Sequence, residues 1–394
     1  MRTRLFGLLM AFAILVMPFA TLAQDDVAMG ADIAEACPAP ANLPESITLG
    51  AVLTLSGGAS VYGSTQQQGI NLAISQINES GYLGEGTTLS VIFEDSASEN
   101  EQAISAMTKL VEEDGVTMVL GPTLSREAFA ADPVAQENGT VVMGVSNTAA
   151  GITDMGEFVF RNSLPEAAVI PGVVAQATAS LGLTKVGLIY ANDDDFTVSG
   201  FNFFRQSFID NGVEIIGEET YATGDVDFRT QLTNLIAAEP DVIAMSALAT
   251  EGVQIILQAR ELGFEGALMG GNGFNSPAVL EQTGEASDGL LVGAAWNIAS
   301  TNPLSTAFMA AYEAAYSAKP DQFAAQAYTG TWMFATALRC ADSVDRTAVR
   351  DALAGLAEFA TPLGSFSFDE NRNPVHDPVV QVAQDGAFSV LGAE

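Results

Sequence analysis

Apolar runs alternate with helical patterns along the chain from residue 47 onward. Residues 47–55, ITLGAVLTL, form a continuous apolar run, which is typical of a strand buried on both faces. Residues 66–81, QQQGINLAISQINESG, carry apolar side chains at helical spacing and end at a glycine, as helices commonly do. The strand pattern returns at 88–95, TLSVIFED. This part of the chain therefore predicts a strand, a helix and a second strand.

The alternation continues to residue 146 and then begins again. In the first series we expect a helix at 98–115, with Ser98 as N-cap and Glu101 at the capping-box position. A strand at 116–121, a helix at 125–139 and a strand at 140–146 follow. The second series predicts strands at 185–193, 213–221, 241–248 and 266–271, and helices at 167–182, 199–212, 227–240 (with Asp227 as N-cap) and 251–263. Two β–α series of similar length predict two doubly wound, parallel-sheet domains.

The last part of the chain has a different pattern. Helices are predicted at 303–320, 326–343 and 347–357, and a turn-rich segment at 364–391 has the pattern of short strands. We expect this late material to return to both domains and to cross between them. The predicted fold class is α/β.

The first 23 residues have the features of a secretory signal peptide. They contain two arginines, an apolar core and small residues at Thr21 and Ala23. A membrane anchor is the alternative, but the apolar stretch is short for a bilayer span and no second stretch resembles one. We expect cleavage near Ala23 and export of the mature protein.

The two cysteines, Cys37 and Cys340, are expected to pair. Export to an oxidising compartment favours a disulfide, which would fasten a Pro- and Ala-rich leader at 24–46 to the body of the protein. Two free thiols are the alternative.

Charge and composition exclude several functions. The 394 residues carry a formal net charge of −34, which repels nucleic acids and anionic lipid headgroups. The glycine-rich stretch GGASVYGST (57–65) has neither the lysine of a P-loop nor the spacing of a dinucleotide-binding turn. The single histidine, His376, lies in a late turn, and no His/Cys cluster could hold zinc. We therefore expect no nucleic-acid partner, no cofactor, no metal and no enzymatic activity.

The loops after the predicted strands suggest a binding protein. In open α/β sheets, ligands sit outside the carboxyl ends of the strands, and the loops there are rich in Ser, Thr, Asn and Gly. We expect the loop 56–63, SGGASVYG, to form part of the cleft rim, with Tyr62 closing over the ligand. Ser125 begins a helix, where free N–H groups favour a carboxylate; the alternative is that it is simply an N-cap.

These stretches resemble a known family, the branched-chain amino acid substrate-binding proteins of ABC transporters. The resemblance covers roughly residues 47–394 and rests on 47–78 together with VTMVLGPTLS (116–125), YANDDDFTVSG (190–200), DFRTQL (227–232), QARELGF (258–264) and MGGNGF (269–274). It implies a type I periplasmic binding fold with two lobes, three hinge crossings, a small-molecule solute in the cleft and docking to an inner-membrane ABC permease. It implies lobe 1 at 47–164 plus 298–361, lobe 2 at 165–297 plus 362–394, and crossings near 163–166, 294–299 and 360–364. We expect the protein to act as a monomer.

The resemblance also implies the ligand-binding residues. Seven positions match the family's site: Tyr62, Ser125, Asn147, Thr148, Phe196, Leu248 and Asn272. The register of Asn147 and Thr148 is open by one residue. Asn272 falls where amino acid binders carry a glutamate for the ligand ammonium, and an amide brings no charge. Glu166 or Asp195 is the expected replacement, and Asp193, Asp194 and Glu251 are further candidates. If none of these acids pairs with a ligand ammonium, the solute is an amide, a urea-like molecule or a carboxylate without an amine. A ligand sensor of the same fold is the alternative function.

Overall fold

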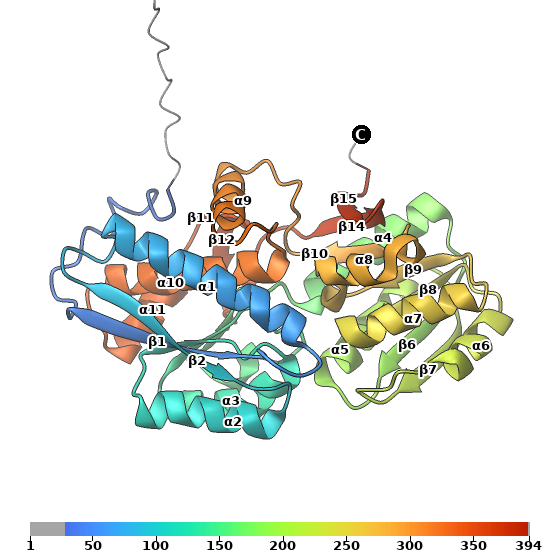
Figure 1. Ribbon diagram of the computed structural model, residues 1–394, viewed down its shortest axis with the longest axis horizontal. Coiled ribbons are helices and arrows are strands. Elements are labelled where there is room, and N and C mark those ends of the chain that lie inside the picture. Colours follow the sequence, from blue (N-terminus) through green and yellow to red (C-terminus); the bar gives the residue numbers. More distant parts are fainter. Residues whose placement is uncertain (1–27, 393–394) are drawn as a thin grey trace, which may run out of the picture.

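The computed structural model describes residues 28–392 and shows two β-sheets side by side along the long axis, each flanked by helices (Figure 1). The expected signal peptide lies outside the described residues. No helix between residues 28 and 392 has an apolar stretch long enough to cross a bilayer.

Lobe 1 is our name for the first sheet with its helices. Its five parallel strands run in the order β2-β1-β3-β4-β5. They are β1 (Ser46–Leu53), β2 (Thr88–Asp95), β3 (Met118–Leu120), β4 (Val141–Gly144) and β5 (Val159–Arg161). The helices are α1 (Ser60–Ser80), α2 (Asn100–Thr108), α3 (Ser125–Glu137), α9 (Pro303–Tyr316), α10 (Gln322–Ala341) and α11 (Arg346–Ala354). A π-helical turn, Lys109–Glu113, extends α2.

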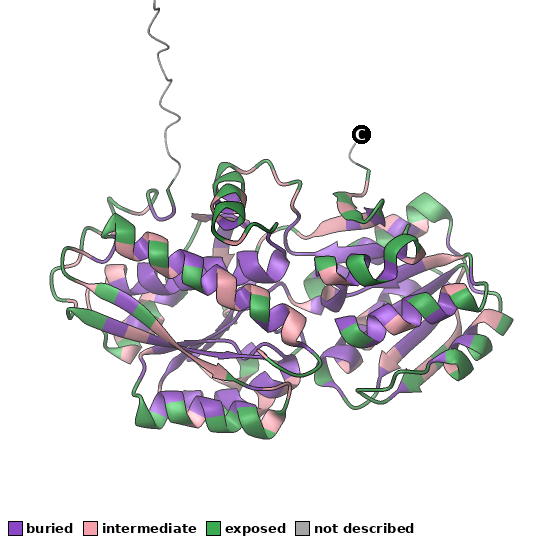
Figure 2. Ribbon diagram, viewed as in Figure 1, coloured by how far each residue is buried: buried purple, intermediate pink, exposed green. Residues whose placement is uncertain are grey.

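Alternating side chains of the central strands fill two separate cores, which explains the continuous apolar runs. Met118 and Leu120 belong to the core beneath α1 and α10, whereas Val119 between them packs with residues of α2 and α3. Helices α1 and α10 touch closely because α1 carries Gly69, where an added Cβ would lie 2.3 Å from the carbonyl oxygen of Ala324. Figure 2 shows buried residues concentrated on the strands and on the helix sides that face them.

Lobe 2 is our name for the second sheet with its helices, and it repeats the same winding. Strands β7-β6-β8-β9-β10 are parallel, and β14 and β15 continue the sheet in antiparallel pairing. The strands are β6 (Lys185–Ala191), β7 (Glu214–Tyr221), β8 (Val242–Ser246), β9 (Ala267–Gly270), β10 (Leu291–Ala294), β14 (Val379–Gln384) and β15 (Ala387–Val390). The helices are α4 (Glu166–Leu181), α5 (Asp195–Asp210), α6 (Arg229–Ala237), α7 (Ala249–Glu261) and α8 (Pro277–Thr283).

The chain passes between the lobes three times, and the third passage differs from the expectation. The first two lie between β5 and α4 and between β10 and α9. We expected the third near 360–364, with 362–394 in lobe 2. Strands β12 (Gly364–Phe368) and β13 (Pro374–Val375) instead form a small sheet with β11 (Phe359–Thr361), and Phe366 lies in the core of lobe 1. Because these aromatic side chains are buried there, the third passage falls between β13 and β14.

Several local expectations are also corrected. Ser98 has φ +64 and is not a cap; Glu99 takes the N-cap position of α2, and the hydroxyl oxygen of Ser98 accepts a bond from the Ala59 N–H instead. Asp227 is exposed and precedes Phe228, the N-cap of α6. Helix α1 begins at Ser60, which places the end of the predicted rim loop inside its first turn.

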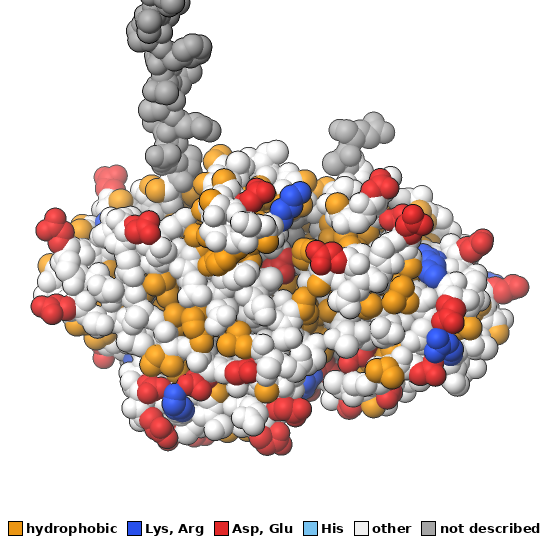
Figure 3. Space-filling model, viewed as in Figure 1, with side chains coloured by type: hydrophobic (Ala, Val, Ile, Leu, Met, Phe, Trp, Pro, Cys, Tyr) orange, Lys and Arg blue, Asp and Glu red, His pale blue; other side chains and the backbone are white. Residues whose placement is uncertain are grey.

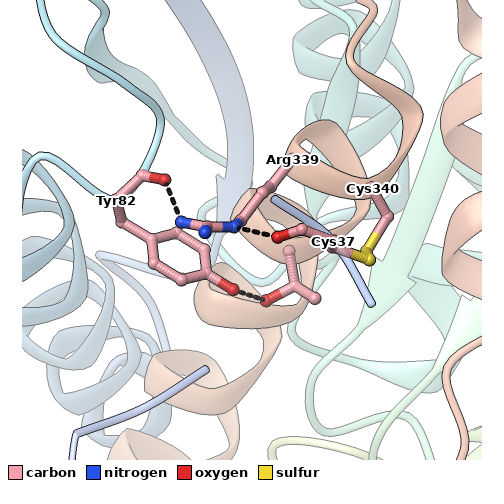
Figure 4. Close-up of a disulfide and its surroundings, with 5 residues drawn as sticks. Cys37, Tyr82, Arg339 and Cys340 are labelled. Atoms are coloured by element: carbon pink, nitrogen blue, oxygen red, sulfur yellow. Dashed lines mark hydrogen bonds between the residues drawn. A yellow bond between two sulfur atoms is a disulfide. The ribbon is translucent and has the colours of Figure 1, made fainter. Parts of the chain in front are cut away.

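The structure joins Cys37 to Cys340 by a disulfide, the pairing expected from the sequence (Figure 4). Arg339, beside Cys340 on α10, donates from Nε to the Cys37 carbonyl and from Nη1 to the Tyr82 carbonyl. The guanidinium also lies 4.7 Å from the centre of the Tyr82 ring. The disulfide and Arg339 therefore hold the leader against α10, within lobe 1.

Candidate functional site

A cavity of about 20 Å³ lies between the lobes, at the carboxyl ends of both sets of parallel strands. Lobe 1 contributes Tyr62, Thr123, Leu124, Ser125, Ser146 and Phe323. Lobe 2 contributes Asp194, Phe196, Leu248, Asn272 and Gly273. This is where the rule for open α/β sheets places a ligand.

Five of the seven predicted ligand-binding residues line this cavity, namely Tyr62, Ser125, Phe196, Leu248 and Asn272. Asn147 and Thr148 do not; the neighbouring Ser146 lines it instead. The Asn147 side chain donates to the Pro122 carbonyl at 3.0 Å, and the Thr148 hydroxyl donates to the Glu166 carboxylate at 2.9 Å. Both side chains are buried beneath the cavity wall, in keeping with a register shift of one residue.

Ser125 is the first residue of α3 and has an uncommitted hydroxyl. Leu124 is the N-cap residue of this helix, so the alternative that Ser125 is only a cap does not describe its position. Its oxygen accepts a long bond from the Ala149 N–H, 3.4 Å, and the structure shows no acceptor for its own proton within the described residues. The unpaired N–H groups of the first helical turn lie beside it, so the place can receive a carboxylate.

The hydroxyls of Thr123 and Ser146, which line the cavity beside Ser125, are held within lobe 1. Thr123 donates to the Gln66 side chain at 2.7 Å, and Ser146 donates to the Thr123 carbonyl at 2.5 Å. The Gln66 amide in turn donates to Ser146 at 2.8 Å. This buried network fixes the loops after β3 and β4, and it leaves Ser125 as the hydroxyl that is free to donate.

Tyr62 extends from lobe 1 into lobe 2. Its hydroxyl donates to the Gly273 carbonyl at 2.7 Å and accepts from the Ala249 N–H at 2.6 Å. The ring packs against Phe323 with centroids 4.6 Å apart, and the residue is only 2% exposed. Burial raises the pKa of Tyr62 well above its usual range, so the hydroxyl keeps the proton that it donates. Tyr62 therefore bridges the two lobes in this closed arrangement.

One buried ion pair also links the lobes next to the cavity. Arg126 on α3 contacts Asp194, the N-cap of α5, at 2.9 Å between Nη1 and Oδ2. Asp194 is 2% exposed and lines the cavity, whereas Asp195, one of the two expected charge partners, is exposed. Among the five acids considered from the sequence, Asp194 is the one that the structure brings to the cavity.

Glu166, the other expected charge partner, lies behind the cavity rather than in it. It is the first residue of α4, is buried, and accepts a hydrogen bond from the Thr148 hydroxyl of lobe 1. Burial raises the pKa of Glu166 to about 7, above its ordinary value of 4.5. The Glu166 carboxyl therefore lies at the first passage between the lobes, on the first residue of lobe 2 helix α4 and in contact with Thr148 of lobe 1.

We expect the Glu166 carboxyl to make the protein less stable as pH rises. The folded state keeps the proton up to about pH 7, while the unfolded chain releases it near pH 4.5. The contribution is fully present below pH 4.5 and is lost as pH passes 7, a change of roughly 1–3 kcal/mol. Between pH 5 and pH 8, the free energy of unfolding measured in urea should fall less in Glu166→Gln than in wild type. The exposed control Glu313→Gln should show the same fall as wild type. An equal fall in all three proteins would contradict the prediction.

Asn272 carries no charge and is already engaged. Its side-chain oxygen accepts from the Gln322 amide of lobe 1 at 2.7 Å, which forms another contact across the lobes. The cavity has room for about one water molecule by volume. A solute of amino acid size therefore requires the lobes to separate or the lining side chains to move.

Sequence reasoning missed several of the lining residues. Thr123 and Gly273 lie within stretches that carried the resemblance, next to residues that were singled out. Phe323 had no such signal, because the helix pattern was read only from residue 326 and tertiary packing alone brings α10 to the cavity. Within residues 28–392, no three His, Cys, Asp or Glu side chains gather as a metal site.

Comparisons with known proteins agree with this architecture. A family model described as periplasmic binding protein matches residues 46–387. The leucine-, isoleucine-, valine-, threonine- and alanine-binding protein of Pseudomonas aeruginosa is 25% identical over 80% of this chain and 84% of its own length. The solved leucine binding protein LivK of Thermotoga maritima has a TM-score of 0.83 at 26% identity, covering 87% of this chain and 97% of its own.

A second solved structure is similar over the same extent. It is the branched-chain amino acid transporter substrate binding protein LivJ of Streptococcus pneumoniae in complex with isoleucine, with a TM-score of 0.82 at 28% identity, covering 88% of this chain and 99% of its own. The overall fold of this chain is thus shared with these two solved proteins over most of its length. The extent of the family match shows that this chain belongs to the periplasmic binding protein family.

Proposed function

We propose that this protein captures a small amino acid-like solute between its lobes and delivers it to an ABC permease in the inner membrane. The relatives named above bind branched-chain amino acids or belong to their transporters. The proposal includes export by a signal peptide cleaved near Ala23 and action as a periplasmic monomer. The cavity offers hydrogen bonds and apolar surface, which supports a binding function.

The observation that carries the proposal is the free hydroxyl of Ser125 at the start of α3. A carboxylate placed there would accept from this hydroxyl and from the N–H groups of the first turn. Leu124, Leu248, Phe196 and Phe323 supply apolar surface for a side chain on the solute. The site therefore suits a small carboxylate with an apolar body.

The ammonium group of such a solute would have one buried acid within reach. Asp194 lines the cavity and already pairs with Arg126, so a second cation would share its carboxylate. Asn272 can accept a hydrogen bond but adds no charge. An amide, a urea-like solute or a carboxylate without an amine is the alternative ligand, and it would not need Asp194 in this role.

Ser125→Ala is expected to weaken binding of a carboxylate solute by about 1–3 kcal/mol, because a hydrogen bond to a charged group is lost. Calorimetric titration with leucine, isoleucine and valine would measure the effect. Ser207→Ala removes another buried serine hydroxyl, on α5 and away from the cavity, and should leave the affinity unchanged. Wild-type affinity in folded Ser125→Ala would remove the basis for placing the carboxylate there.

A further inference from the structure

A second and larger cavity lies beside the second passage between the lobes. Its volume is about 410 Å³, within the range of small-molecule sites, whereas the cavity at the strand ends measures about 20 Å³. Lobe 1 forms one side with the link between α9 and α10, and lobe 2 forms the other with α8 and the β14–β15 hairpin. Figure 3 shows the surface hollowed between the lobes on this face, with hydrophobic side chains near the hollow.

Apolar side chains supply much of this cavity's wall. Trp296 belongs to the passage itself and is 5% exposed, and its indole N–H is already bonded to the Ser305 hydroxyl at 2.9 Å. Leu280 and Phe388 of lobe 2 and Ile298 of the passage add aliphatic and aromatic surface. A ligand with a flat apolar body would find contacts on several sides.

The polar part of the wall is a chain of buried side-chain amides whose oxygens are already used. The Asn297 amide donates to Gln381 at 2.6 Å, and the Gln381 amide donates to Asn275 at 2.6 Å. The Asn297 oxygen accepts from the Ala299 N–H, and the Gln322 oxygen accepts from the Ala295 N–H.

The amino groups of this chain are only partly used. The NH₂ groups of Asn297, Gln381 and Gln322 each make one hydrogen bond within the described residues, and each has two protons to donate. Three N–H donors therefore remain beside apolar surface, while the first lone pair of each carbonyl is taken. This wall favours a ligand that brings a hydrogen-bond acceptor.

The charges around the cavity exclude an anion as the preferred acceptor. Asp321 and Glu281 both line it, and the one cation among the lining residues is Lys319, which is exposed. Burial raises the pKa of Asp321 to about 7, so the repulsion of a carboxylate ligand would come mainly from the exposed Glu281 carboxylate and from the net charge of −34. A neutral carbonyl or amide oxygen meets the donors without that repulsion.

We propose that this cavity is a second ligand site, which takes a small uncharged molecule with an aromatic or apolar body and a carbonyl or amide end. The site does not depend on which solute binds at the strand ends. Because its walls come from both lobes and from the passage between them, its occupant would be sensitive to their relative position. Any coupling of the two sites would be reciprocal.

Three probes of nearly equal size and different charge test the proposal: benzamide, benzoate and benzylammonium. Calorimetric titration of wild type should show saturable benzamide binding and at least about tenfold weaker binding of both charged probes. Trp332→Phe leaves Trp296 as the only tryptophan, and its emission should respond to benzamide with the same dissociation constant.

Variants that fill the cavity identify the site. Ala387 and Glu281 are exposed lining residues, so Ala387→Phe and Glu281→Phe should each weaken benzamide binding by at least about tenfold. Ser389→Phe, two residues along β15 and outside the lining, is the matched control and should bind like wild type. The proposal is overturned if benzamide does not saturate, if both filled variants bind it normally, or if benzoate binds as tightly as benzamide.

Discussion

Tyr62→Phe is expected to weaken solute binding by about 2–4 kcal/mol, which is about 30- to 1,000-fold. The change removes only the hydroxyl that bridges the lobes. Closure would then bury the Gly273 carbonyl and the Ala249 N–H without the partner that each has in this structure. With the lobes apart, both groups can bind water, so the cost falls on the closed, ligand-holding state.

Calorimetric titration of the same solute into wild type and Tyr62→Phe measures this loss. Tyr82→Phe is the matched control, because the Tyr82 hydroxyl pairs with Thr336 inside lobe 1 and not across the lobes. The control should lower the free energy of unfolding while leaving the affinity unchanged. If Tyr62→Phe instead lowers only the stability of the solute-free protein, the bridge is part of the scaffold.

Removing the disulfide is expected to lower the free energy of unfolding substantially. The cysteines are 303 residues apart, and in the chain-entropy model closing so long a loop stabilises the folded state by roughly 6 kcal/mol. The Cys37→Ser/Cys340→Ser double variant should lose about that amount in equilibrium urea unfolding. Solute affinity should not change, since the leader packs on lobe 1 and contributes no residue to the cavity.

A thiol measurement provides the direct check on this pairing. Wild-type mature protein, unfolded without reductant, should have no alkylatable thiol, and two should appear after reduction. Two reactive thiols before reduction would contradict the pairing. A double variant as stable as wild type would show that Arg339 and the other leader contacts hold this segment without the disulfide.

Much of the fold was predictable because the strands are buried on both faces and the helices end at glycines. β1 and α3 lie close to their predicted bounds for this reason. The short strands β5 and β10 were not predicted from the sequence. The third passage was misplaced because burial of Phe366, and not a local turn signal, decides which lobe receives β12.

The site was predictable as a set of loops and less so as individual side chains. Ser125 could be predicted because a serine at the start of a helix places its hydroxyl beside free backbone N–H groups, where a carboxylate binds favourably. The choice of Asp195 over Asp194 depended on one step at the start of α5, where adjacent side chains point in different directions. Phe323 reaches the cavity only through the packing of α10 on α1, which no local pattern describes.

The order in which this chain is synthesised has a bearing on when it can fold. The first sheet is complete at β5, but α10, which covers one of its faces, is made only after all the parallel strands of lobe 2. Lobe 2 in turn waits for β14 and β15 at the end of the chain. At translation rates of about 5–20 residues per second, the first sheet lacks that cover for roughly 10–30 seconds. Neither lobe can reach the arrangement of this structure until these late elements have been made.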